Sequence, residues 1–238
     1  SLSLYIDRAN IAKKYTSARN TNYICYFTDD MNKKLNMKNM IESEMVRALS
    51  KGEFVVYYQP KYELANDTII GAEALVRWNH KEKGIISPGV FIPVFERNGF
   101  IVDLDFYVYE QVLKMQKHRL DMGKKVIPIS MNVSRCHLSD TNFVDKLEAV
   151  VAKYKVPKQY IEMEITESIF SQEDSSAIAL IYNLKEHGFT ISMDDFGSGY
   201  SSLNLLRKVQ IDTLKIDKVF IDSTEDVQRS QVIVEEII

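Results

Sequence analysis

Residues 160–167 read YIEMEITE, and the alternation within this stretch decides the fold class. Successive side chains of a β-strand point to opposite faces, so the stretch divides into two rows. One row is apolar, and the other holds Glu162, Glu164 and Thr166. In an open antiparallel sheet such a polar row would face water. The rest of the sequence decides whether that explanation applies here.

Short β-rich segments alternate with longer helical patterns on both sides of this stretch. The predicted strands are FVVYYQ (54–59), TIIGAEALVRW (68–78), VIPISMNVS (126–134), YIEMEITE (160–167), FTISMDDF (189–196) and TLKID (213–217). Apolar residues recur at helical spacing over 104–123, 142–156 and 175–188, and the first and last of these patterns end at Gly123 and Gly188. Repeated strand–helix units predict a parallel sheet, either open or closed into a barrel.

Polar rows recur in the other predicted strands. They are Gly71, Glu73, Leu75 and Arg77; Ser130, Asn132 and Ser134; Thr190, Ser192 and Asp194; and Thr213, Lys215 and Asp217. Because parallel sheets covered on both faces usually read as unbroken apolar runs, this alternation indicates a closed barrel with polar rows inside. Unpaired charges inside a barrel are costly, so the rows favour a site at the C-terminal ends of the strands. A few paired, purely structural charges are the alternative.

The inward side chains offer oxygen ligands without a paired His/Cys set, which favours Mg²⁺ or Mn²⁺ over zinc. Four candidates come from four different strands and suit one ion: Glu73, Asn132, Glu164 and Asp194. Asp195 could bridge a second ion only if the backbone changes direction at the strand end, because parity places it on the outer face. Gly197 and Gly199 permit such a change.

Two metal ions about 4 Å apart suit a phosphodiester displacement, because they hold both the attacking and the leaving oxygen. Lys215 could then neutralise phosphate charge or position the attacking water. An ion pair between Lys215 and Asp217 is the structural alternative. The letters of Asp195, Phe196 and Gly197 match the kinase DFG motif, but no HRD loop or glycine-rich phosphate loop accompanies them. The four histidines are scattered and are interpreted as surface or structural residues.

Composition is that of an ordinary globular protein of 238 residues, 45% hydrophobic and 26% charged. With 30 basic and 33 acidic residues the formal charge is −3, which gives no electrostatic reason to expect duplex nucleic acid as a partner. Cys25 and Cys136 lie far apart and indicate neither a disulfide framework nor a zinc ribbon. No apolar run has membrane-spanning length, so we expect no membrane contact by this segment and a cytoplasmic location, with a parent protein that could be membrane-anchored.

With these residues identified, the chain resembles the EAL-domain family of cyclic-di-GMP phosphodiesterases from about residue 40 to its end. The matching stretches are YYQP (57–60), EALVRW (73–78), SPGVFIPVFERNGF (87–100), SMNVS (130–134), EITES (164–168), DDFGSGYSSL (194–203) and LKID (214–217). The resemblance implies a TIM-like (β/α)₈ barrel with one antiparallel strand. It also implies metal-dependent hydrolysis of cyclic-di-GMP to linear pGpG, with Mg²⁺ or Mn²⁺ as cofactor and two ions expected.

The resemblance also implies roles for individual residues. The implied metal ligands are Glu73, Asn132, Glu164, Asp194 and Asp195, the ligand-binding residues are Gln59, Leu75 and Arg77, and the catalytic residues are Lys215, Asp217 and Glu167. Glu167 matches the glutamate that braces the loop after Asp195, and that loop is implied in homodimer contacts. The structural alternatives are a salt bridge at the rim for Arg77 and a helix N-terminal charge for Glu167.

Three segments are expected along the chain. Residues 1–30, predicted as a helix, a polar turn at 20–22 and a short strand ending at Phe27, resemble the C-terminal remnant of a GGDEF diguanylate cyclase domain, without its GGDEF motif. Residues 31–52 are predicted to form a linking helix with an apolar stripe, ended by Gly52. Residues 53–238 are the EAL domain.

The EAL segment is expected to be incomplete at its C-terminal end, because Ile238 falls in the helix after the sixth predicted strand. The family's last two strands, with an EGVE-like glutamate and a QGY-like glutamine, are not in this sequence, and we expect them in a continuation of the natural chain.

The predicted function is therefore metal-dependent cyclic-di-GMP hydrolysis within a larger bacterial signalling protein that also carries a GGDEF domain. The main alternative is a catalytically inactive module that binds the dinucleotide for regulation. The intact EALVRW and DDFG stretches and Lys215 favour the enzyme, whereas the missing C-terminal residues favour the alternative. A scaffold that binds only a protein partner is a third possibility, disfavoured because the expected ligand residues present in this sequence are intact.

Overall fold

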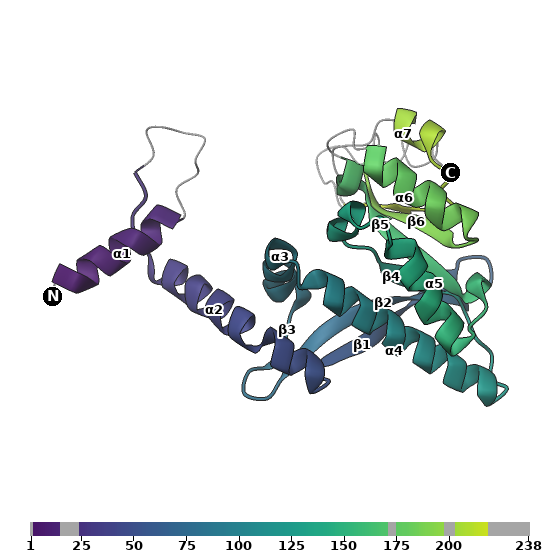
Figure 1. Ribbon diagram of the computed structural model, residues 1–238, viewed down its shortest axis with the longest axis horizontal. Helices are drawn as coiled ribbons and strands as arrows, with labels where there is room; N and C mark the ends of the chain where they lie inside the picture. Colours follow the sequence, from purple (N-terminus) through teal and green to yellow (C-terminus); the bar gives the residue numbers. More distant parts are fainter. Residues whose placement is uncertain (1, 15–23, 171–174, 198–202, 219–238) are drawn as a thin grey trace.

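A curled mixed sheet forms the centre of the molecule in the computed structural model, which describes residues 2–14, 24–170, 175–197 and 203–218 (Figure 1). Its strands follow the order β1-β2-β4-β5-β6-β7, with β3 paired to β2. Their bounds are β1 Phe54–Glu63, β2 Thr68–His80, β3 Gly84–Ile86, β4 Ile129–Asn132, β5 Ile161–Thr166, β6 Thr190–Phe196 and β7 Thr213–Ile216. The six strands predicted between residues 54 and 217 are all present.

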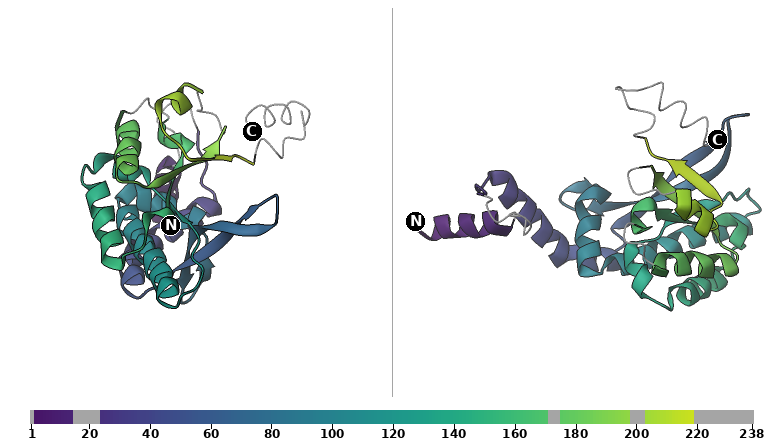
Figure 2. Two further views of the ribbon diagram at one scale, coloured as in Figure 1. Left: turned by 90° about the vertical axis from the view of Figure 1, so that its right-hand side faces the viewer. Right: turned by 90° about the horizontal axis from the view of Figure 1, so that it is seen from above.

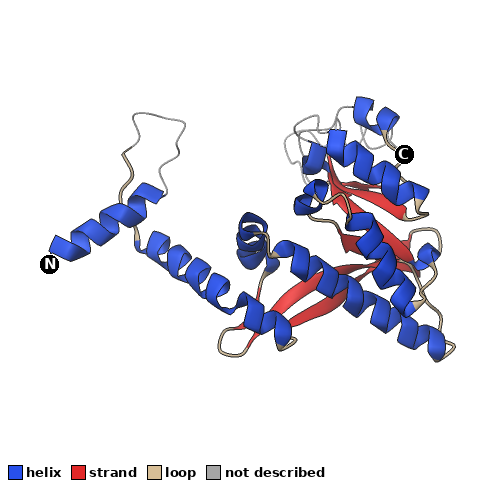
Figure 3. Cartoon of the chain, in the orientation of Figure 1, coloured by secondary structure: helices blue, strands red, loops and turns tan. Residues whose placement is uncertain are grey.

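The sheet is half of a TIM-like barrel, which confirms the predicted fold class. Strands β2, β4, β5, β6 and β7 pair in parallel, and β1 pairs antiparallel with β2, as the resemblance implied. Helices cover the outer face of the curled sheet (Figure 3). The apolar row of β5, with Ile161, Met163 and Ile165, is buried in the hydrophobic core.

The helices around the sheet are α3 Pro88–Asn98, α4 Ile101–Asp121, α5 Phe143–Tyr154, α6 Ser175–Glu186 and α7 Leu203–Lys208. The predicted ends of two of them are confirmed, because Gly123 and Gly188 follow α4 and α6 with positive φ values of 63° and 79°. Neither α3 nor the short β3 was predicted. Short 3₁₀ turns span Arg135–Ser139, Lys158–Tyr160 and Glu167–Phe170.

Helix α3 is held on the sheet by an aromatic cluster. Phe91 and Phe95 of α3 are fully buried and contact Phe54 of β1 and Trp78 of β2, with ring centroids 5.7 Å apart for Phe54–Phe91 and 6.2 Å apart for Trp78–Phe95. Aromatic pairs at these separations add to the stability gained from burial. The cluster fixes α3 beside the C-terminal half of β2, where it can form a wall of a site.

The N-terminal helices α1 Leu2–Lys14 and α2 Asp29–Ser50 extend away from the barrel (Figure 2). A helix is present where the linking helix is predicted: Thr28 caps the N-terminus of α2, Gly52 follows it with φ 68°, and Ile41 of its apolar stripe is fully buried. The predicted strand ending at Phe27 is wrong for residues 24–27, which have no regular structure. Within the described residues, no helix combines the length and the apolar character needed to cross a membrane.

Candidate active site

Four charged side chains from four strands meet inside the half-barrel near the C-terminal ends of its strands. The Lys215 Nζ of β7 lies 2.9 Å from Glu73 Oε2, 2.5 Å from Glu164 Oε1 and 3.1 Å from Asp194 Oδ1. We call Glu73, Glu164, Asp194 and Lys215 the rim cluster. Parity within single strands placed these side chains on the inner face, and the curvature of the sheet brings them into contact.

When its three carboxylates are ionised, the rim cluster has two more negative charges than the ammonium group of Lys215 neutralises. Glu164 is fully buried, and this burial, together with the nearby charges of Glu73 and Asp194, raises the pKa of Glu164 to about 7 against the opposing effect of Lys215. Desolvation acts to lower the pKa of Lys215, but its hydrogen bonds to Glu164 and Glu73 outweigh desolvation and raise that pKa. Lys215 is therefore a charged donor at neutral pH.

A second polar group lies nearer the N-terminal ends of the strands, and we call its members Lys61, Ser130 and Glu162 the floor cluster. Lys61 Nζ lies 2.9 Å from Glu162 Oε1 and 2.5 Å from Ser130 Oγ, and Ser130 donates to Glu162 Oε1 at 2.9 Å. Burial acts to raise the pKa of Glu162, but the hydrogen bond and charge of Lys61 outweigh it and lower the pKa. The floor cluster balances one carboxylate with one ammonium group.

The backbone changes direction at the end of β6. Strand parity requires such a change if Asp195 is to share a site with Asp194. Asp195 has a left-handed backbone with φ 57°, and the pairing of β6 with β7 shifts register between Met193 and Phe196. Gly197 follows with φ 95°, and its N–H donates to Glu167 Oε2 at 2.7 Å. The turn therefore occurs at Asp195 itself as well as at Gly197, while Gly199 lies outside the described residues.

The two carboxylates around this turn are in different environments. Glu167 is fully buried and holds the turn through its bond to Gly197. Asp195 is exposed, yet partial desolvation and the nearby charges of Asp194 and Asp217 raise the pKa of its carboxyl group. Asp217 donates its backbone N–H to the carbonyl of Phe196 at 3.1 Å, so the exit of β7 is tied to the same turn.

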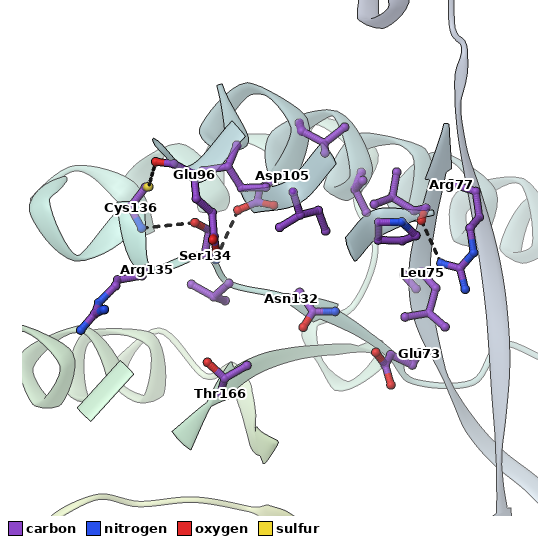
Figure 4. Close-up of a pocket in the computed structure, with 18 of the residues that line it drawn as sticks. Glu73, Leu75, Arg77, Glu96, Asp105, Asn132, Ser134, Arg135, Cys136 and Thr166 are labelled. Atoms are coloured by element: carbon purple, nitrogen blue, oxygen red, sulfur yellow. Dashed lines mark hydrogen bonds between the residues drawn. The ribbon is translucent and has the colours of Figure 1, made fainter. Parts of the chain in front are cut away.

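A cavity of about 560 Å³ adjoins the rim cluster, and Glu73 belongs to both (Figure 4). Volumes of about 300 to 1,000 Å³ are typical of small-molecule sites. Of the residues predicted from sequence, Glu73, Leu75, Arg77 and Asn132 line the cavity. Arg77 donates to the carbonyl of Val76 at 2.9 Å. Gln59 is exposed on β1, directly opposite Glu73 in the β1–β2 register, and is not one of the lining residues.

The opposite wall of the cavity comes from α3, α4 and the loop after β4, none of which the sequence pattern had assigned to a site. Its polar members are Glu96, Asp105, Ser134, Arg135 and Cys136. One signal was available in the sequence: Asp105 lies on the buried face of α4 between Leu104 and Val108. A carboxylate at such a position needs a buried partner, and His137 supplies it at 2.9 Å.

The donor set of this region fits a hard divalent cation. Carboxylate and amide oxygens are the preferred ligands of Mg²⁺ and Mn²⁺. Glu164 Oε2 is buried and has no hydrogen-bond partner among the described residues, with Lys61 Nζ at 3.9 Å. Within the part of the chain that the structure describes, no three acidic, His or Cys side chains already converge as a metal-ligand set. Lys215 lies between the three carboxylates of the rim cluster.

Comparison with known proteins gives matches in both sequence and structure. The family model described as EAL domain matches residues 42–238. The bifunctional diguanylate cyclase/cyclic di-GMP phosphodiesterase MucR of Pseudomonas aeruginosa is 31% identical over 214 residues, which are 90% of this chain and 31% of that protein. The chain spans about a third of the length of the first curated relatives it matches.

Two solved structures illustrate the structural likeness. The PaMucR phosphodiesterase in complex with c-di-GMP superposes with a TM-score of 0.76 at 31% identity, covering 83% of this chain and 80% of that one. The EAL domain protein of Listeria monocytogenes EGD-e superposes with a TM-score of 0.68 at 28% identity, covering 82% of this chain and 76% of that one.

Proposed function

The chain belongs to the EAL domain family, and on that premise we propose that it hydrolyses cyclic-di-GMP to linear pGpG in a metal-dependent reaction. The observation that carries the proposal is the convergence of Glu73, Glu164 and Asp194 on Lys215 at the edge of a cavity of about 560 Å³. The similarity to a phosphodiesterase solved with c-di-GMP supports the choice of substrate.

The cavity and its edge would hold the dinucleotide. Leu75 supplies apolar surface to the cavity, and Arg77 supplies a cation that suits a phosphate oxygen. Gln59 lies opposite Glu73 on β1, where its amide can reach a ligand that extends out of the cavity. In this arrangement the scissile phosphate lies close to Glu73, because Glu73 is the residue shared by the cavity and the rim cluster.

Five residues would hold the cofactor, which we propose is a pair of Mg²⁺ or Mn²⁺ ions. They are Glu73, Asn132, Glu164, Asp194 and Asp195. When bound, such ions neutralise phosphate charge and lower the pKa of a coordinated water. Lys215 remains protonated and donates a hydrogen bond to the attacking water or to a phosphate oxygen. Glu167 holds the turn that presents Asp195, and Asp217 ties the exit of β7 to that turn.

We propose the same organisation of the whole protein as the sequence predicts. Residues 1–30 are the end of a GGDEF-like domain, residues 31–52 a linking helix and residues 53–238 the EAL domain of a bacterial signalling protein. We also propose a cytoplasmic site of action without membrane contact or duplex nucleic acid as a partner. The proposed homodimer contact, the loop after Asp195, falls largely on residues 198–202, which lie outside the described residues.

The test is an assay of the full-length protein with cyclic-di-GMP and Mn²⁺ or Mg²⁺, with separation of pGpG as the measurement. We expect hydrolysis that stops on chelation of the metal and is lost in Glu73→Ala and Asp194→Ala. Glu186→Ala, which removes an exposed carboxylate on α6, is the control and keeps its activity. Hydrolysis that survives Glu73→Ala would refute the proposed mechanism. Tight binding of cyclic-di-GMP without product would instead select a regulatory binding module.

A further inference from the structure

A tyrosine of α4 is bonded to the end of the strand that carries Asn132. Tyr109 is fully buried, and its hydroxyl donates to the backbone carbonyl of Asn132 at 2.8 Å. Asn132 is the last residue of β4, where the sheet ladder gives way to the loop that lines the cavity. The direction of the Asn132 side chain follows from its backbone. A hydrogen bond that holds the Asn132 carbonyl therefore also fixes the direction of this side chain.

The same helix holds the loop at a second point. Asp105, one turn before Tyr109, accepts a hydrogen bond from the N–H of Ser134 at 3.3 Å and is paired with His137 at 2.9 Å. The helix therefore offers a donor to a strand-end carbonyl and an acceptor to an amide two residues later. Side chains at positions i and i+4 share one face of a helix, so both contacts come from the buried face of α4.

The strand end is also coupled to the rim cluster. The N–H of Val133, directly after Asn132, donates to the carbonyl of Glu164 at 2.8 Å. A displacement of the β4 exit would therefore move a backbone bonded to a second candidate metal ligand. Tyr109 contacts the backbone of Asn132 from α4. It does not line the cavity and is not a member of the rim cluster.

We propose that Tyr109 is a positioning residue for the metal site, which fixes Asn132 through its carbonyl and so sets the affinity of the site for divalent cations. This inference rests on the proposed function, in which Asn132 is a metal ligand. Burial and the nearby charge of Asp105 raise the pKa of Tyr109 well above its ordinary value, so the hydroxyl is always present as a donor. Residues that support metal ligands in this way typically change metal affinity about 10- to 100-fold when they are replaced.

The chain contains a matched control on the same helix. Tyr107 also lies on α4, and its hydroxyl donates to the carbonyl of Phe54 on β1 at 3.0 Å. The bond type, the helix and the size of the change are the same, but the acceptor lies at the start of β1, away from the site. Tyr107→Phe therefore reports the cost of losing such a bond without any effect on Asn132.

The experiment measures Mn²⁺ affinity and thermal unfolding of the full-length protein without cyclic-di-GMP, for the unmodified protein, Tyr109→Phe and Tyr107→Phe. We expect both variants to fold, because each keeps its ring, and thermal unfolding reports the stability that each loses. Mn²⁺ binding should weaken about tenfold in Tyr109→Phe and stay within about twofold in Tyr107→Phe. Equal Mn²⁺ affinities for the two variants would overturn the proposal.

A double-mutant cycle tests whether Tyr109 acts through Asn132. Adding Tyr109→Phe to Asn132→Ala should cause no further loss of Mn²⁺ affinity, whereas a fully additive loss would contradict the positioning role. Hydrolysis of cyclic-di-GMP is measured in parallel. Mn²⁺ binding without hydrolysis in the unmodified protein would refute the proposed function and leave the positioning role standing if the two tyrosine variants differ.

Discussion

The floor cluster and the rim cluster are both charged groups inside one half-barrel, yet they differ in charge balance and in hydrogen bonding. In the floor cluster, Lys61 and Ser130 both bond to Glu162, and one ammonium meets one carboxylate. In the rim cluster, Lys215 contacts three carboxylates, and one buried oxygen of Glu164 has no hydrogen-bond partner in the part of the chain that the structure describes. A buried group is expected to be satisfied when its role is purely structural.

This difference in charge balance and hydrogen bonding indicates which charged side chains are functional. Buried charges that neutralise each other stabilise a fold, or at least cost little, and need no ligand. A buried excess of negative charge is unfavourable by itself and becomes favourable when a cation binds. The two clusters share β5, where Glu162 and Glu164 lie two residues apart on the same face, so the sequence pattern alone does not separate these two glutamates.

The largest expected effect is on catalysis, and it distinguishes one glutamate of each cluster. Glu164→Gln should reduce metal-dependent hydrolysis of cyclic-di-GMP about a thousandfold, because it removes a charge that contacts the reacting centre. Glu162→Gln removes the same charge two residues away on the same face of β5 and should keep activity within about tenfold. The measurement is the rate of pGpG formation by each variant at saturating Mn²⁺. Similar losses in the two variants would mean that both clusters serve catalysis.

The next effect is a pH dependence of opposite sign for the two glutamates. In the metal-free protein the pKa of Glu164 is about 7, above its ordinary 4.5, so the native state holds a proton that the unfolded state releases. This group therefore lowers the free energy of unfolding as pH rises from about 4.5 to about 7, by about 3 kcal/mol in total. The pKa of Glu162 is lowered, so its contribution to stability is instead lost as pH falls through that pKa.

Urea denaturation with a chelator present, between pH 4 and pH 8, measures both trends. Glu164→Gln should remove the stability loss on going to pH 8, whereas Glu162→Gln should keep that loss and reduce stability at neutral pH. An unmodified protein whose stability is the same at pH 5 and pH 8, with no change in Glu164→Gln, would contradict the assigned environment of Glu164.

A smaller effect concerns the cation of the floor cluster. Lys61→Met leaves Glu162 buried without its ammonium partner and should lower the free energy of unfolding by about 2 kcal/mol. Lys124→Met removes the same charge from an exposed position after α4 and should change it by less than about 0.5 kcal/mol. Equal denaturation midpoints for the two variants would show that the floor cluster does not contribute to stability.

The smallest expected effect concerns the turn at the end of β6, which follows Asp194 of the rim cluster. Gly197 has φ 95°, so Gly197→Ala should lower the free energy of unfolding by about 1 kcal/mol and shift the turn that presents Asp195. Gly89→Ala in α3, where an added Cβ meets nothing within 4 Å, is the control and should not destabilise. A Gly197→Ala protein with unchanged stability and unchanged hydrolysis would show that the turn tolerates a side chain.

The sequence predicted most of the sheet because each strand carries its own alternation. Side-chain parity in β5 and β6 is sufficient to identify Glu164 and Asp194 as inward residues. The strand predicted to end at Phe27 failed because a strand is stable only with a partner, and its sequence does not reveal whether one exists. The far wall of the cavity was missed because tertiary packing places it: α3 packs on the aromatic cluster, and α4 reaches the wall through its buried face.

The properties that the sequence alone predicts are local. They are the alternation of residues within strands, the ends of helices and the strand ends that carry carboxylates. These properties depend on one residue and its near neighbours, so they can be read along the chain. Only the tertiary structure decided that Lys215 meets Glu73, 142 residues away, that Lys61 neutralises Glu162, and that Tyr109 is bonded behind Asn132. Those contacts arise from the curvature of the sheet and the placement of α4, and both are set by packing over the whole half-barrel.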